Sequence, residues 1–155
     1  MPNSAPLRVV RTNSKNEWFQ ELVKLLDADL AIRDGDDHDF YHQFNGIDQL
    51  NQVVMVFKGE VAVACGAFKP YNSSTVEIKR MYTHEAHRGE GYASLALAEL
   101  ENWAVEMGFE TALLETGIKQ PEAIGLYGKI GYHKCENYGQ YAGLDTSVCF
   151  SKELR

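Results

Sequence analysis

The hydrophobic positions of the first fifty residues predict one strand and one helix. The stretch LRVVRT (Leu7–Thr12) has the pattern of a short β-strand. Apolar side chains then recur at helical spacing at Trp18, Leu22, Leu25 and Leu26. This periodicity predicts a helix through NEWFQELVKLLDADLAI, with Ser14 as its N-cap. The aspartate-rich segment RDGDDHDFYHQFNG breaks the pattern and predicts a loop with room for one helical turn.

The middle of the chain predicts three strands in a meander. The apolar runs VVMVF and VAVACGAF flank KGE, which indicates a β-hairpin with its turn at Lys58–Glu60. TVEIKRMYT (Thr75–Thr83) follows after a turn as the third strand. Strand alternation places Glu77, Lys79 and Met81 on one face of this strand, and Ile78, Arg80 and Tyr82 on the other.

The C-terminal half predicts two helices that alternate with strands. A helix follows the glycine-rich stretch and runs to about Gly108. TALLET (Thr111–Thr116) is typical of a buried strand, and PEAIGLYGKI (Pro121–Ile130) of a helix with proline in its first turn. YHKC and TSVCFSKEL close the chain as two strands. The order of elements therefore predicts an α/β fold with a mixed sheet, antiparallel first and parallel in the middle.

Composition and charge narrow the classes of protein. The 155 residues suit a single domain, residues 1–155, since domains cluster at roughly 100–150 residues. No apolar run approaches the ~18 residues of a membrane span, and MPNSAPLRVV lacks the features of a signal peptide, so we expect a cytoplasmic protein. A net charge of −7 argues against nucleic acid as a partner.

The cysteines show no metal-binding pattern. Cys65, Cys135 and Cys149 are widely spaced, and we expect them to be reduced residues of the core. We therefore expect no metal site.

The stretch RGEGYA, between a predicted strand and a predicted helix, points to an anion. Gly89 and Gly91 remove side chains at a helix start, where free N–H groups and the helix dipole favour a phosphate or pyrophosphate. A tight turn is the alternative for a lone pair of glycines. The stretch is not a P-loop, which needs lysine and Ser/Thr after the second glycine, nor the three-glycine dinucleotide fingerprint.

Residues 88–93, R-x-x-G-x-A, match the R/Q-x-x-G-x-G/A signature of the GNAT superfamily of N-acetyltransferases, which bind acetyl-coenzyme A. EIKRMYTHEAHRGEGYASLAL resembles the fourth strand, loop and third helix of that family. QPEAIGLYGKIGY is similar to its later N-x-x-A-x-x-x-Y-x-x-x-G-F element, with Gln120 for asparagine and Tyr132 for phenylalanine. The resemblance extends from about residue 53 to residue 132 and is weaker before residue 50.

The resemblance implies the GNAT fold, in which the fourth and fifth strands splay apart and leave a slot for the pantetheine arm of acetyl-CoA. Backbone amides of the glycine-rich loop would bind the pyrophosphate, and the end of the preceding strand would bind the arm as an added strand. The implied cofactor-binding residues are Met81, Tyr82, Thr83, Arg88, Gly89, Glu90, Gly91, Tyr92, Ala93, Ser94 and Gln120.

Acetyl transfer by direct attack needs a neutral amine, an acid for the departing thiolate and stabilisation of the oxyanion. By resemblance, Tyr127 is the general acid; alternatively, it is a half-buried helix tyrosine with its hydroxyl on water. Glu77, eleven residues before the signature arginine, has the offset of the glutamate base in some members, including the histone acetyltransferase branch. Its alternatives are an ion pair with Lys79 or Arg80, or exposure on the sheet. Glu115 is a second candidate base.

The acceptor amine is less defined by the sequence. Arg80 is either a receptor for a substrate carboxylate or a surface arginine. An acidic cluster lies where similar proteins form the acceptor wall, and it either attracts a cationic amine or is a solvated loop: Asp34, Asp36, Asp37 and Asp39. Nearby aromatic residues either form that wall or anchor the loop: Phe40, Tyr41 and Phe44.

These observations favour an N-acetyltransferase acting on the primary amine of a small molecule such as an amino acid, a polyamine or an amino sugar. Two alternatives stay open. One is a protein acetyltransferase acting on lysine or an N-terminus, and the other is a non-catalytic module that senses acetyl-CoA. The sequence does not define the oligomeric state, for which a homodimer is one candidate.

Overall fold

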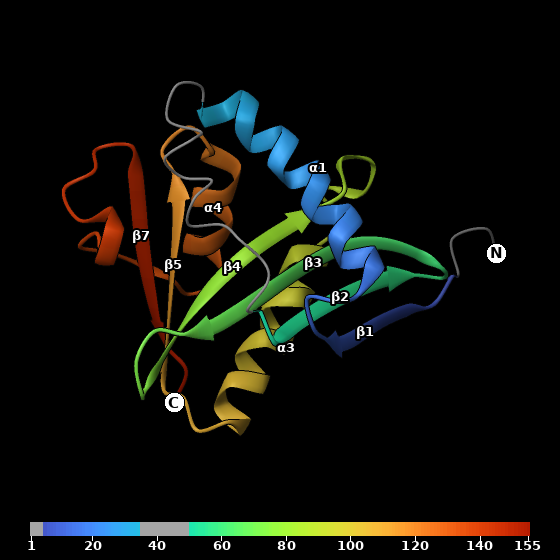
Figure 1. The fold of residues 1–155 in the computed structure, drawn as a ribbon, viewed down its shortest axis with the longest axis horizontal. Helices are drawn as coiled ribbons and strands as arrows, with labels where there is room; N and C mark the ends of the chain where they lie inside the picture. The colour runs from blue at the N-terminus through green and yellow to red at the C-terminus, as the bar shows by residue number, and fades with distance from the viewer. Residues whose placement is uncertain (1–4, 35–49) are drawn as a thin grey trace.

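The fold is a seven-stranded mixed sheet with helices on both faces (Figure 1). The computed structural model describes residues 5–34 and 50–155. The strands lie in the order β1-β2-β3-β4-β5-β7-β6. Their bounds are β1 (Leu7–Thr12), β2 (Gln52–Lys58), β3 (Val61–Pro70), β4 (Thr75–Thr83), β5 (Thr111–Gly117), β6 (His133–Cys135) and β7 (Ser147–Glu153). The helices are α1 (Glu17–Asp34), α3 (Tyr92–Glu106) and α4 (Pro121–Lys129), with short 3-10 turns at Glu85–His87 and Gly139–Tyr141. The predicted α/β fold and order of elements are confirmed.

Two hydrophobic cores lie on the two faces of the sheet. Val53, Met55 and Phe57 of β2 pack with α1 on one face. Val54 and Val56 of the same strand pack with α3 and α4 on the other. Because both faces of β2 are covered, its sequence reads as a continuous apolar run and not as an alternating one.

The N-cap of helix α1 lies two residues after the predicted one. Asn16, and not Ser14, is the N-cap: its Oδ1 accepts a hydrogen bond of 3.0 Å from the backbone N–H of Phe19. The buried face also differs from the predicted one, since Trp18 is 54% exposed and Leu25 is 43% exposed. Phe19, Leu22, Val23 and Leu26 form the stripe that packs on the sheet. A helix with apolar residues on two sides offers more than one stripe, and the sheet selects one of them.

Strands β4 and β5 splay apart, as the resemblance implied. They form the parallel pair of the sheet, and their register covers only the first three residues of each, from Thr75 opposite Thr111 to Glu77 opposite Leu113. Strand β7, by contrast, pairs antiparallel with β5 along its whole length. The second half of β4 is therefore separated from β5, and Figure 1 shows the two strands diverging.

A β-bulge in β4 corrects the predicted alternation of side chains. Cys65 of β3 pairs with Tyr82, but Ala67 pairs with Lys79, so Gly66 faces both Arg80 and Met81. Arg80 has φ of 59°. Beyond Lys79, the predicted assignment of side chains to the two faces of the sheet was wrong. Arg80 points to the α1 face, where it contacts Asp27, and Met81 points to the opposite face.

Gly66 lies opposite this bulge. A Cβ at position 66 would collide with the sulfur of Met81 and lie 2.9 Å from Cδ1 of Leu100. The side chain of Met81 therefore fills the space beside Gly66, and a larger residue there would require Met81 and Leu100 to move.

Candidate active site

A cavity of about 490 Å³ lies between the end of β4, the start of α3 and helix α4. Ten of the eleven predicted cofactor-binding residues line it: Met81, Tyr82, Thr83, Arg88, Gly89, Gly91, Tyr92, Ala93, Ser94 and Gln120. The exception is Glu90, whose carboxylate oxygens lie 3.9 Å from Lys58 Nζ and 3.9 Å from His87 Nδ1. The structure thus brings together two segments that the sequence separates, the glycine-rich loop and Gln120.

The glycine-rich loop has the geometry of an anion site. Gly89 and Gly91 both have φ of 85°, a left-handed conformation that favours glycine. Gly91 is the N-cap of α3, and no described side chain caps this helix start. An added Cβ at either glycine would meet no described atom within 4 Å. The first N–H groups of α3 therefore face open space at the positive end of the helix dipole.

The signature arginine fixes this loop to the end of β4. Arg88 Nε donates a hydrogen bond of 3.0 Å to the carbonyl oxygen of Thr83. Its guanidinium carbon lies 5.4 Å from the centroid of the Tyr82 ring, and Nη2 lies 3.9 Å from Asp29 Oδ2. The side chain of Arg88 thus connects the loop to the end of β4, and the glycines leave the backbone accessible.

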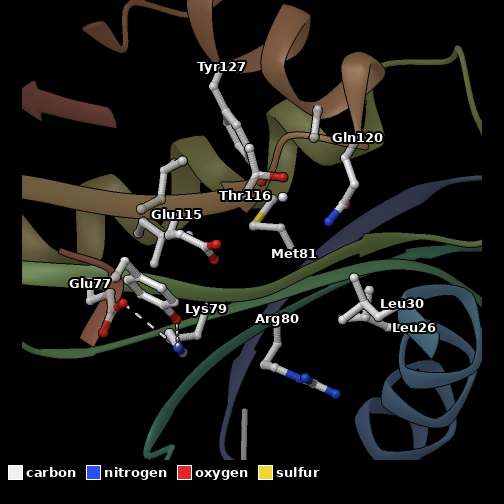
Figure 2. Close-up of a pocket in the computed structure, with 15 residues that line it drawn as sticks. Leu26, Leu30, Glu77, Lys79, Arg80, Met81, Glu115, Thr116, Gln120 and Tyr127 are labelled. Carbon is white, nitrogen blue, oxygen red and sulfur yellow. Dashed lines mark hydrogen bonds and ion pairs between the residues drawn. The ribbon is translucent and has the colours of Figure 1, made fainter. Parts of the chain in front are cut away.

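A second, smaller cavity of about 110 Å³ opens where β4 and β5 splay apart. Figure 2 shows its polar side chains arriving from both strands and from α4. Charged and polar side chains that line it include Glu77, Lys79, Arg80, Glu115, Thr116, Gln120, Tyr127 and Tyr141. Five residues line both cavities: Leu26, Met81, Gln120, Ala123 and Tyr127. Tyr127 therefore lies where the two cavities meet.

Tyr127 is a buried residue, so the half-buried alternative is wrong. The residue is 7% exposed, and its ring lies 6.0 Å from the centroids of both Tyr132 and Phe150. Figure 2 shows the side chain pointing from α4 toward Thr116 and Glu115 on β5. Burial, with a smaller effect of the Glu115 carboxylate, raises the pKa of Tyr127 well above the ordinary value of 10.0. The hydroxyl therefore keeps its proton at neutral pH.

Glu77 lines the small cavity and also has polar partners within the protein. Its Oε2 accepts a hydrogen bond of 2.9 Å from the hydroxyl of Tyr138 and lies 3.8 Å from Lys79 Nζ. Its Oε1 lies 3.9 Å from Lys69 Nζ. The predicted ion pair with Lys79 is thus present, whereas exposure on the sheet is ruled out by a residue exposure of 3%. Burial lowers the pKa of Lys79, and Glu77 opposes this shift in part.

Sequence reasoning missed Tyr138 and Tyr141. Both lie between β6 and β7, and their rings pack edge to face with centroids 5.7 Å apart. Tyr138 holds Glu77, and the hydroxyl of Tyr141 accepts a hydrogen bond of 3.5 Å from Lys79 Nζ. Their place depends on β7 inserting between β5 and β6. No periodicity or motif in this segment indicates that insertion.

Several predictions fall outside what the structure describes or change in detail. Most of the acidic and aromatic residues predicted to form the acceptor wall lie outside the described residues: Asp36, Asp37, Asp39, Phe40, Tyr41 and Phe44. Asp34 ends helix α1, but its side chain is also outside what the structure describes. Cys65, Cys135 and Cys149 are free thiols, and Cys135 is only partly buried. Within residues 5–34 and 50–155, no three His, Cys, Asp or Glu side chains gather as metal ligands would. None of the helices described here combines the length and the apolar character needed to cross a membrane.

Comparison with known proteins identifies the family. The family model described as "Acetyltransferase (GNAT) family" matches residues 18–132. The uncharacterized N-acetyltransferase YjgM of Escherichia coli is 38% identical over 122 residues, which cover 70% of this chain and 72% of YjgM. A Klebsiella pneumoniae protein assigned as an acyl-CoA N-acyltransferase has a TM-score of 0.82 and 27% identity, covering 98% of this chain and 100% of its own. Salmonella typhimurium YncA, solved with its cofactor acetyl-CoA, shares the fold with a TM-score of 0.68 and 15% identity, covering 96% and 94% of the two chains. The chain therefore belongs to the GNAT family and is an acetyl-CoA-dependent N-acetyltransferase.

Proposed function

We propose that this acetyltransferase acts on the primary amine of a small molecule by direct attack, with Tyr127 as the general acid. The observation that carries the proposal is the position of Tyr127, which lines both the large and the small cavity. The large cavity takes acetyl-CoA, and the small one takes the amine. A cavity of about 110 Å³ lined by buried polar side chains suits a small polar molecule.

The described residues fit acetyl-CoA, which supplies an acetyl thioester. The N–H groups at the start of α3, with Gly89 and Gly91, bind the pyrophosphate. The register of β4 with β5 ends at Glu77, so the β5-facing edge of residues 81–83 has no strand partner among the described residues. This edge binds the pantetheine arm as an added strand. YncA, which has the same fold, was solved with acetyl-CoA, and this supports the assignment.

Tyr127 donates a proton to the departing thiolate, and Glu77 accepts one from the attacking amine. The hydroxyl of Tyr127 keeps its proton because burial raises its pKa, and it delivers that proton to the departing thiolate sulfur. Glu77 accepts the proton of the attacking amine through a water molecule. Its hydrogen bond from Tyr138 keeps the carboxylate in one orientation at the cavity wall. Glu115, on the facing strand of the same cavity, is the second candidate for this role.

Release of free coenzyme A thiol, measured over a panel of acceptors, tests the proposal. The panel contains amino acids, polyamines, amino sugars, and peptides with a free lysine or a free N-terminus. We expect turnover with a subset of the small amines. Turnover with peptides alone would make the protein an acetyltransferase of proteins. Binding of acetyl-CoA without thiol release for any acceptor would indicate a sensor module.

A further inference from the structure

We propose that the acceptor amine also carries a carboxylate, and that Arg80 binds this carboxylate in the small cavity. The inference rests on the proposed function, since it names the substrate class of the same site. Among the charged residues that line the cavity, Arg80 combines deep burial with an unused hydrogen-bond donor. It is therefore a buried arginine and not the surface arginine that sequence reasoning left open.

The guanidinium of Arg80 is only partly satisfied within the protein. Its side chain is 2% exposed, and Nη2 forms an ion pair of 2.5 Å with Asp27 Oδ1 of α1. The Nε of Arg80 has no hydrogen-bond partner among the described residues. Buried donors are nearly always paired, and an unpaired donor on a charged group is costly. A carboxylate oxygen in the adjoining cavity would satisfy this Nε–H.

The backbone holds Arg80 toward the cavity at a conformational cost. Arg80 is the one non-glycine residue with positive φ in the part of the chain that the structure describes. The bulge places its side chain on the same face as Glu77 and Lys79, where regular alternation would have turned it away. Strained backbone of this kind persists mainly at functional sites, where surrounding structure holds it.

The other charges of the cavity leave this role to Arg80. Glu77 lies within 4 Å of both Lys79 and Lys69, so these three side chains form one ion-pair group. Arg80, which is paired with Asp27, is the remaining cation that lines the cavity, and Figure 2 shows it apart from that group, on the side of α1. Tyr127 lines the same cavity at its junction with the large one. A molecule with its carboxylate at Arg80 and its amine toward Tyr127 is an amino acid.

Matched substrates test the proposal by activity. Each amino acid in the thiol-release assay is compared with its carboxamide and with the amine that lacks the carboxyl group. We expect kcat/KM of the preferred amino acid to exceed that of its carboxamide by about 10- to 100-fold, the range for hydrogen bonds to charged groups. Arg80→Gln should remove this ratio, so that the amino acid and its carboxamide react with similar kcat/KM. Arg8→Gln, the same change at an exposed arginine of β1, should leave the ratio unchanged.

A direct measurement keeps the proposal testable if Arg80→Gln fails to fold. The side-chain Nε–H resonance of Arg80, assigned with Arg80→Lys, is followed by NMR in the wild-type protein with coenzyme A present. N-acetylglycine should shift this resonance, whereas N-acetylglycinamide should not. Equal responses to the two probes, no response to either, or a response to inorganic phosphate alone would overturn the proposal.

The two arms separate failure of the inference from failure of the proposed function. Thiol release with amines but without preference for a carboxylate would leave the acetyltransferase function intact and remove the role of Arg80. Absence of thiol release with every amine, together with a carboxylate-specific shift of the Arg80 resonance, would remove the proposed reaction and keep the carboxylate site.

Discussion

Replacement of Tyr127 by phenylalanine gives the sharpest test of the proposed chemistry. The ring packs against Tyr132 and Phe150 at centroid distances of 6.0 Å, and these contacts do not involve the hydroxyl. Tyr127→Phe therefore removes one oxygen and leaves the packing in place. If the hydroxyl protonates the thiolate, its interaction strengthens only as the carbon–sulfur bond breaks, so binding of acetyl-CoA should barely change.

The expected magnitude separates catalysis from structure. Loss of a positioned general acid lowers turnover by about 10²–10⁴-fold. Loss of a buried hydroxyl that serves only structure costs about 1 kcal/mol of stability, which shifts the melting temperature by roughly 2–4 °C for a chain of this size. We expect Tyr127→Phe to lower turnover by the full factor of a lost general acid, and to lower the melting temperature by no more than the loss of one buried hydroxyl does. The two measurements are independent of each other.

The assay is single-turnover acetyl transfer, because slow product release would hide a change in the chemical step. Tyr132→Phe is the matched control, because it also removes a tyrosine hydroxyl from this aromatic cluster. That hydroxyl donates a hydrogen bond of 2.9 Å to Glu101 Oε2 on α3. The control should lower stability and keep the single-turnover rate. Equal rates for Tyr127→Phe and wild type would refute the role of Tyr127 as acid.

The raised pKa of Tyr127 also predicts a pH profile. A tyrosine acid must be protonated to act, and a raised pKa extends the protonated form to higher pH. Burial and Glu115 shift this pKa upward from 10.0. The wild-type single-turnover rate should therefore show no alkaline decline up to about pH 10, the ordinary pKa of tyrosine. A decline with a midpoint near pH 9 would contradict a buried, proton-bearing hydroxyl.

Three further predictions concern the cofactor, the base and the fold. Acetyl-CoA at about 100 times its Kd should stabilise the protein by roughly 2.7 kcal/mol, measured as a thermal shift. Gly91→Glu should abolish that shift. The melting temperature of Gly91→Ala without ligand, compared with that of the wild type, measures the effect of backbone strain at this position. Glu77→Gln should lower turnover at neutral pH and recover in part at alkaline pH, where the amine loses its proton unaided, whereas Glu115→Gln should keep the wild-type pH–rate profile. Asn16→Ala should lower the free energy of unfolding by about 1 kcal/mol in denaturant titration, because it removes the N-cap of α1, and a larger loss with Ser14→Ala would contradict that assignment.

Local patterns predicted the elements of the fold well, because those elements depend on local physics. Apolar runs, glycine turns and the proline at the start of α4 define strands and helices within a few residues of the observed bounds. The glycine-rich turn before α3 was predicted for the same reason, since a helix start with glycine at its N-cap is a short, contiguous stretch of backbone. Tyr127 and Gln120 were found by resemblance, and the structure places both on the wall between the two cavities.

Features that depend on distant segments were not predicted. The N-cap of α1 was misplaced because Ser14 contacts a distant segment of the chain. Its backbone N–H donates a hydrogen bond of 2.9 Å to the carbonyl oxygen of Leu50, just before β2. The hydrogen bond from Tyr138 to Glu77 was missed because it depends on β7 lying beside β5. Each of these contacts joins residues far apart in the chain, and neither leaves a periodic signal in the sequence.

The bulge in β4 shows how a single extra residue decides which side chains of the strand face the small cavity. Side chains of a strand alternate between faces, so one inserted residue reverses the face of every later side chain. Without the bulge, regular alternation would turn Arg80 toward the apolar core between the sheet and α3, and Met81 toward the α1 face. With it, the guanidinium reaches Asp27, and Met81 fills the space above Gly66. The glycine in β3 and the strained arginine in β4 are therefore parts of one arrangement, which Met81 connects to both cavities.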